Sequence, residues 1–145
     1  MDTNKIIKYS VGALVVVVVV AIIVAVAAKI KTALTNAVQN AKLTADANAE
    51  IDTAKRTLTD AQINTVVSKL KAAFYSGAFG WAEDEDAIYA AFEQIGSRSD
   101  LLTVEKEFGV YNEKTLAEHI TSLLSQSEID HINQILAAKQ IDYKY

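Results

Sequence analysis

The chain has 145 residues, of which 51% are apolar and 22% charged, and it contains neither cysteine nor proline. Residues 1–58 carry seven Lys/Arg and four Asp/Glu, whereas residues 59–145 carry seven and fourteen, so the second part is acidic. An acidic domain disfavours nucleic-acid binding, which needs clustered cations. The lack of cysteine excludes a disulfide scaffold, a thiolate nucleophile and cysteine-ligated zinc. Five glycines and no proline favour a mostly helical chain.

Residues 9–28 form an uncharged segment between two pairs of lysines. Twenty helical residues span about 30 Å, which matches the hydrocarbon core of a bilayer. In lipid only a helix satisfies the backbone of such a segment by itself. We therefore predict a retained single-pass anchor over residues 1–31, with a bilayer as its first partner. The predicted span includes Tyr9, Val15, Val20, Ile23 and Ala28.

Two features of this segment leave alternatives open. Ala25-Val26-Ala27 has the small-x-small form of a signal-peptidase site, so a cleavable signal peptide competes with the retained anchor. The lysines on the two sides are too similar in number to set a membrane orientation. Ala21 and Ala25 form a small-xxx-small pair of the kind that packs helices together, which suggests a homo-oligomer through the anchor.

Residues 32–58 are rich in Ala, Thr, Asn, Asp and Lys and contain neither Gly nor Pro. Ile30, Leu34, Val38 and Ala41 recur at helical spacing, which predicts that the helix continues with a narrow apolar stripe. A semi-rigid helical stalk is our first interpretation. A marginally ordered linker is the second, because an Ala-rich helix without a packing partner is only marginally stable.

The sequence pattern of residues 59–145 predicts an all-α domain of five short helices with one core. Helix starts are predicted at Thr59, Asp84, Ser99 or Asp100, Thr115 and Ser125, and helix stops at Gly77, Gly80, Gly96 and Gly109. Apolar residues follow each start at helical intervals, and no strand-like alternation competes with them. The aromatic tail 141–145 either packs back on the domain or presents a recognition end.

This domain resembles a single annexin repeat. The run Gly80-Trp81-Ala82-Glu83-Asp84-Glu85-Asp86-Ala87-Ile88 is similar to the annexin stretch Gly-Leu-Gly-Thr-Asp-Glu-Asp-Ala-Ile. Ser97-Arg98-Ser99 matches the Ser-Arg-Ser that opens the third helix of the family, and 116–125 resembles its fourth helix. The resemblance covers roughly residues 60–140 and implies a five-helix fold. Domains of this single-repeat kind resemble ones in bacterial and phage proteins.

The departures from the annexin pattern affect calcium binding. The resemblance implies a site made by loop carbonyls and a distant carboxylate, but Ala82 and Glu83 replace the second glycine and the threonine, and Leu123 replaces the acid. Calcium takes six to eight oxygens, and the missing carboxylate is its strongest ligand. We therefore expect no annexin-type calcium site. Gly80, Trp81, Glu83 and Asp84 remain candidates for a degenerate or protein-binding loop.

Catalytic patterns are not found in the sequence. His119 and His131 are twelve residues apart without a metal-binding motif, and no glycine-rich phosphate loop is present. We therefore expect no enzymatic activity, no cofactor and no metal. The sequence favours a membrane-anchored structural or protein-interaction protein, and a lipid-containing phage particle or a bacterial envelope fits it. The alternative is an annexin-like lipid-binding module with a degenerate calcium site.

Overall fold

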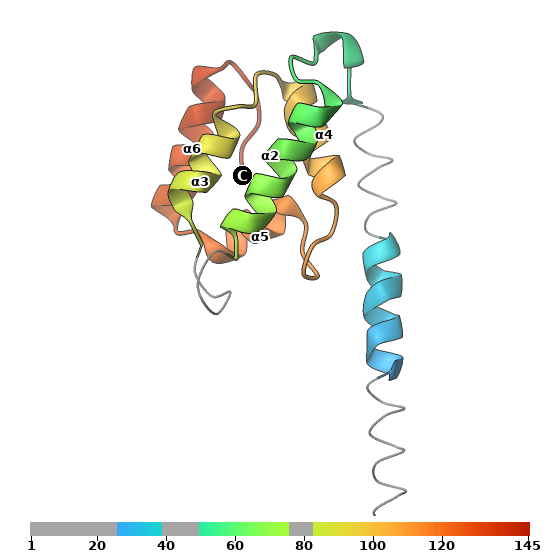
Figure 1. Ribbon diagram of the computed structural model, residues 1–145. Helices are drawn as coiled ribbons and strands as arrows, with labels where there is room; N and C mark the ends of the chain where they lie inside the picture. Colours follow the sequence, from blue (N-terminus) through green and yellow to red (C-terminus); the bar gives the residue numbers. More distant parts are fainter. Residues whose placement is uncertain (1–25, 39–49, 76–82) are drawn as a thin grey trace, which may run out of the picture. The chain divides into compact units, whose positions relative to one another are not determined.

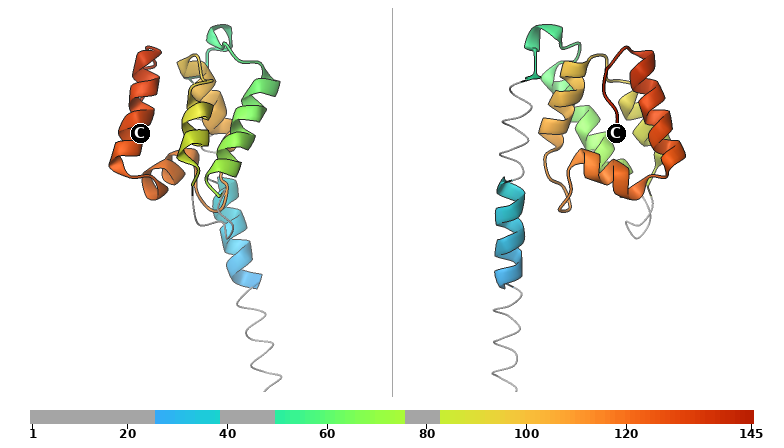
Figure 2. Two further views of the ribbon diagram at one scale, coloured as in Figure 1. Left: turned by 60° about the vertical axis from the view of Figure 1, so that its left-hand side comes forward. Right: turned by 180° about the vertical axis from the view of Figure 1, so that it is seen from behind.

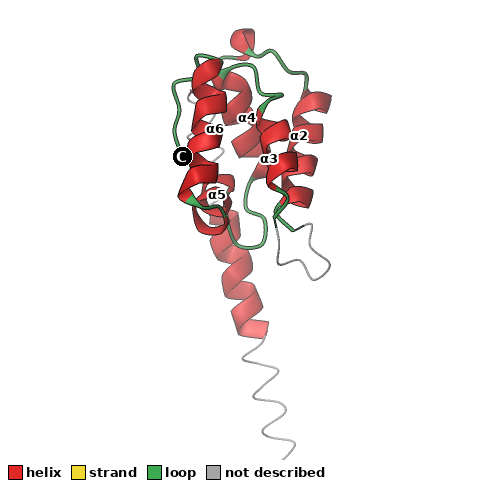
Figure 3. Ribbon diagram, turned by 90° about the vertical axis from the view of Figure 1, so that its left-hand side faces the viewer, coloured by secondary structure: helices red, strands yellow, loops and turns green. Residues whose placement is uncertain are grey.

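The computed structural model describes residues 26–38, 50–75 and 83–145, in which the elements are helices joined by loops and no strand is present (Figures 1 and 3). The predicted all-α class is therefore confirmed. The chain divides into two compact units, Met1–Ala37 and Val38–Tyr145. The elements of the second unit are η1 (Thr53–Lys55), α2 (Asp60–Ala73), α3 (Glu85–Phe92), α4 (Arg98–Phe108), α5 (Leu116–Leu123) and α6 (Gln126–Ala138).

The N-terminal unit is described only at its end, where residues 26–38 are helical. The stripe positions Ile30, Leu34 and Val38 lie on this helix, and their side chains are exposed. Within the described ranges, no helix has both the length and the apolar character that crossing a bilayer requires. The predicted span 9–28 lies outside the described residues except for its last three, which include the exposed Ala28.

We call residues 50–145 the head, and local sequence signals start most of its helices. Thr59 begins α2 with a complete capping box, in which its hydroxyl accepts from the backbone of Gln62 and the Gln62 side chain accepts from Thr59 N. Thr115 and Glu118 form the same arrangement at α5. Such boxes satisfy amides that have no partner within the helix. The predicted helix starts at Thr59, Asp84 and Thr115 are confirmed, since these residues are the N-caps of α2, α3 and α5.

The start of α4 differs from the prediction. Ser97, and not Ser99 or Asp100, is the N-cap, and its hydroxyl accepts a hydrogen bond from Asp100 N at 3.1 Å. Asp100 is unavailable as a cap because its carboxylate faces the segment before α2. Gly109 does end α4, with a φ of 60° that favours glycine. Gly96 lies beyond the end of α3, whose C-cap is Glu93, so it does not stop that helix.

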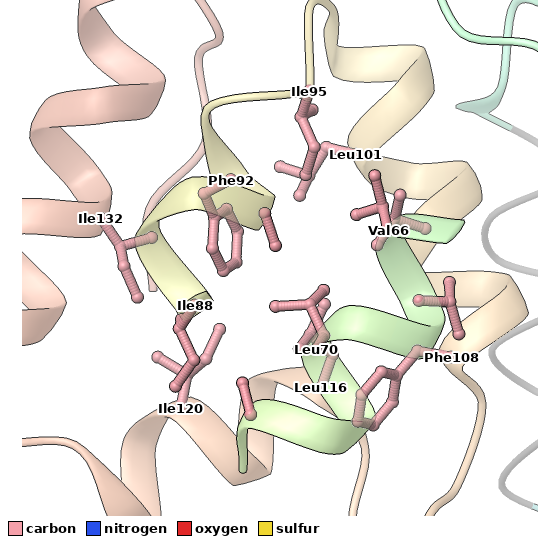
Figure 4. Close-up of a cluster of buried hydrophobic side chains, with 14 of the residues drawn as sticks. Val66, Leu70, Ile88, Phe92, Ile95, Leu101, Phe108, Leu116, Ile120 and Ile132 are labelled. Atoms are coloured by element: carbon pink, nitrogen blue, oxygen red, sulfur yellow. The ribbon is translucent and has the colours of Figure 1, made fainter. Parts of the chain in front are cut away.

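The core of the head lies where α2 packs against α3 and α4, α3 against α6, and α4 against α5 (Figures 2 and 4). The apolar positions predicted for the inner helix faces are buried, except that Leu123 and Ile135 are half-buried at its edge. The largest fully buried side chains are Phe74, Phe92, Phe108, Ile63, Leu70, Ile88, Ile95, Leu101, Leu116, Ile120, Ile132 and Leu136. Burial of each such side chain contributes about 1.5–3 kcal/mol, so this core is the main source of stability.

Candidate functional site

Only the end of the predicted loop 80–84 lies among the described residues. Gly80, Trp81 and Ala82 lie outside the described residues, whereas Glu83 and Asp84 precede α3. The Asp84 carboxylate accepts from Ala87 N at 3.0 Å, and Asp84 N donates to the carbonyl of Ala73 at 2.8 Å. Asp84 is thus the N-cap of α3 and also ties that helix to the end of α2. A carboxylate at a helix N-terminus is stabilised by the free amides there.

The position that would supply the distant calcium ligand is Leu123, whose half-buried side chain packs against the core. It offers no oxygen to a cation. Among the described residues, no three acidic or histidine side chains converge as a metal site would require.

His119 is one of the most deeply buried polar side chains of the head. Its ring stacks on Phe74 with centroids 5.0 Å apart and meets the edge of Phe108 at 5.4 Å. Nε2 donates to the carbonyl of Tyr111 at 2.8 Å, and the Tyr75 hydroxyl lies 3.4 Å from Nδ1. Burial lowers the pKa of His119, which favours a neutral ring. This histidine joins the irregular segment after α4 to the core.

His131 lies in different surroundings from His119. Its side chain is exposed on α6 and contacts the Tyr89 ring edge-on at 4.5 Å. The two histidines therefore occupy different environments, and the structure does not bring them together as a site.

Asp100 binds the chain segment that precedes α2. Its Oδ1 accepts from the backbone N of Thr57 at 2.9 Å and of Leu58 at 3.0 Å. Its Oδ2 accepts from the Thr57 hydroxyl at 2.6 Å and from Gly96 N at 3.3 Å. Burial raises the pKa of Asp100, but these hydrogen bonds outweigh it and hold the pKa below its usual value. A carboxylate fully buried in this way is a structural anchor.

Glu105, one and a half turns further along α4, binds the C-terminal tail 141–145. The hydroxyls of Tyr143 and Tyr145 both donate to its Oε1, at 2.8 and 2.9 Å. Burial raises the pKa of Glu105, and the two tyrosine hydrogen bonds only partly oppose this. Burial and the nearby carboxylate also raise the pKa of both tyrosines. The tail packs back on the head, which resolves the alternative that the sequence left open.

Further contacts fix the tail beside α6 (Figure 3). Asn133 accepts from Tyr145 N at 3.0 Å and donates to its carbonyl at 3.4 Å, so one side chain pairs with both backbone groups. The Tyr145 ring meets Phe92 edge-on at 5.7 Å. Arg98 donates to the carbonyl of Asp142 at 2.5 Å. We call the four residues that contact the tail, Phe92, Arg98, Glu105 and Asn133, the tail site.

A separate hollow lies between α2 and α4. Its volume is about 230 Å³, and it is lined by Asp60, Ile63, Asn64, Thr103 and Glu107. The Asp60 carboxylate already pairs with Arg56 at 2.8 Å, and the Thr103 hydroxyl donates to the carbonyl of Ser99 at 2.6 Å. Two of the polar side chains of the hollow, Asp60 and Thr103, are therefore engaged in structural bonds.

Sequence reasoning missed Asp100 as an anchor, and it missed Glu105 and the other residues of the tail site. The partners of Asp100 lie 42 and 43 residues earlier, and those of Glu105 lie 38 and 40 residues later. A weak signal exists, because Glu105 falls on the side of α4 that also carries the buried Leu101, four residues away.

Comparison with known proteins adds no relative: no family model, no curated protein and no solved structure matches this chain. The annexin resemblance therefore stays a prediction drawn from short motifs. The geometry shows a helical head in which buried polar side chains hold the segment before α2 and the C-terminal tail.

Proposed function

We propose that this protein is a non-enzymatic, single-pass membrane protein whose acidic helical head binds other proteins. The observation that carries the proposal is the uncharged segment 9–28 between lysine pairs, which matches the thickness of a bilayer. A structural component of a lipid-containing phage particle or of a bacterial envelope is the setting that this architecture suits.

The residues of the head that would be considered first for chemistry are held in structural bonds. His119 is engaged with the carbonyl of Tyr111 inside an aromatic cluster. Asp84 caps α3, and Asp100 is engaged with four donors from three residues. Each of these groups therefore has a structural partner that would have to be given up before it bound or transformed a substrate.

The anchor is tested by fractionating cells that express the full chain and washing the membranes with alkaline carbonate. We expect the wild type and a Val16→Leu/Val19→Leu control to remain in the membrane pellet. A Val16→Lys/Val19→Lys variant should enter the supernatant, because each lysine costs about 2.5–3.5 kcal/mol at the centre of a spanning helix. A wild-type chain recovered in the supernatant, or a mature N-terminus at Ala28, would contradict the anchor.

The lipid-binding alternative predicts that calcium bridges the head to anionic lipid. We expect no such bridge, because Leu123 supplies no oxygen and residues 59–145 are acidic, which repels an anionic surface. The test is co-sedimentation of residues 50–145 with phosphatidylserine vesicles, with and without millimolar calcium. Pelleting that depends on calcium would replace the protein-binding proposal with the lipid-binding one.

A further inference from the structure

The helix formed by residues 26–38 carries every large hydrophobic side chain that is exposed within the described ranges (Figure 1). Val26 is 50% exposed, and Ile30, Leu34 and Val38 are 63%, 65% and 63% exposed. These residues recur every four positions, so they form a stripe along one side of the helix. An amphipathic helix gains most of its stability when such a stripe packs against another apolar surface.

The spacing within this helix is typical of a coiled coil. Four apolar residues alternate by three and four positions, and we call them the seam: Ala27, Ile30, Leu34 and Ala37. The same alternation continues in the sequence to Ile23 before the helix and to Ala41 after it. A seam with this period keeps facing a second helix of the same kind over its whole length.

The residues beside the seam are compatible with a parallel pair of identical helices. In a parallel coiled coil, a residue bordering the seam on one helix faces the residue five positions later on the other. Val26 of one copy would thus face Lys31 of the other, and Ala33 would face Val38. Neither pairing sets two like charges opposite each other.

The head offers no apolar surface that would cover the stripe. Among residues 50–75 and 83–145, no large hydrophobic side chain is exposed, because those of the head lie in its core or at the edge of that core. Within the part of the chain that the structure describes, the counterpart of the stripe is therefore the same stripe on another copy.

We propose that two copies of this chain pair in parallel and in register through the seam. The occupant of the stripe is a second copy, since its spacing and its borders suit an identical helix. The parallel orientation rests on the proposed function, because copies that are held in one bilayer by residues 9–28 present their following helices in the same direction. The pairing itself goes beyond that function.

The experiment uses single cysteines, because the chain has none of its own. Full-length Ile30→Cys and Leu34→Cys variants place the thiol on the seam. Thr32→Cys and Asn36→Cys are the matched controls, since they lie two residues further along and on the opposite side of the same helix. Membranes from cells that express each variant are treated with a mild oxidant, and disulfide-linked dimers are measured by non-reducing electrophoresis.

We expect the seam cysteines to form dimers at least about fivefold faster than the control cysteines, because a disulfide requires Cβ atoms about 4 Å apart. Equal rates at all four positions, or no dimers at any, overturn the pairing. Faster reaction of the controls also overturns it. Ala25 and Thr32 are seven residues apart, so association through Ala21 and Ala25 would bring the control side of a continuous helix together.

A second measurement uses Ala37→Cys as a reporter on the seam. Ile30→Lys/Leu34→Lys should slow dimer formation by the reporter to the rate of the Thr32→Cys control, because it places four lysines between the paired helices. Thr32→Lys/Asn36→Lys adds the same charge on the opposite side and should leave the rate unchanged. Equal effects of the two double variants overturn the pairing. The carbonate wash of the same membranes tests the anchor separately, so failures of the two proposals are distinguishable.

Discussion

The segment before α2 and the C-terminal tail are both bound by a carboxylate of α4, yet the two bonds differ in kind. Asp100 accepts mainly backbone donors of Thr57, Leu58 and Gly96, whereas Glu105 accepts two phenolic hydroxyls on a single oxygen. Burial acts on both groups, but the pKa of Asp100 ends below its usual value and that of Glu105 above it. The number and type of donors therefore decide in which direction the pKa of a buried carboxylate moves.

The largest effect expected is on the segment before α2. Asp100→Ala should lower the free energy of unfolding by about 3–5 kcal/mol, because removal of one partner leaves several buried donors without an acceptor. The measurement is urea unfolding of residues 50–145, followed by circular dichroism. Asp130→Ala on the exposed face of α6 is the control, and we expect it to change stability by less than about 0.5 kcal/mol. Equal losses in the two variants would show that Asp100 anchors nothing.

The opposite pKa shifts of the two carboxylates predict opposite pH dependences. Asp100 has a lowered pKa in the folded state, so its contribution is present above its usual pKa of 3.8 and is lost as the pH falls below that value. Glu105 has a raised pKa, so its contribution is present below its usual 4.5 and is lost as the pH rises through the folded value.

Asp100→Asn should therefore cost more stability at pH 7 than at pH 3, and Glu105→Gln should cost more at pH 4 than at pH 7. Both are measured by urea unfolding across this range, each against the wild type at the same pH. A common direction for the two variants would contradict the distinction between the two carboxylates.

The smallest expected effect concerns Gln140, which follows α6 and has a positive φ. Gln140→Gly should raise the free energy of unfolding by about 0.5–1 kcal/mol, because glycine adopts a positive φ without steric cost. Gln140→Ala, which keeps a Cβ, should not stabilise the head. Thermal unfolding of both variants separates the two cases, and a destabilised glycine variant would show that the positive φ of Gln140 carries no steric cost.

The helices and the core were predictable because their signals are local. Capping boxes such as Thr59 with Gln62 join residues three apart, and helical spacing of apolar residues follows from the geometry of a single turn. The start of α4 was not predictable in this way, since Ser97, Ser99 and Asp100 are all cap-type residues. Asp100 is engaged by Thr57, 43 residues away, and the Ser99 hydroxyl by Asp52 N, 47 residues away, so Ser97 caps the helix.

The tail site was beyond prediction for a related reason. Glutamate is mostly exposed in proteins, so a glutamate on a helix is normally expected to face solvent even beside buried residues. Its burial here depends on two tyrosines that follow a further two helices. The same holds for Asn133, which reads as an ordinary helix residue until the tail lies beside it.

The close approach of Gly96 to Thr57 offers a way to recognise relatives of this chain. A Cβ on residue 96 would lie 2.3 Å from the Thr57 hydroxyl oxygen, so glycine is required there for space and not for backbone conformation. That hydroxyl is the one that donates to Asp100. We therefore expect diverged homologues to change residues 57, 96 and 100 together or not at all. A pattern of Thr, Gly and Asp at these spacings would identify them where overall similarity has faded.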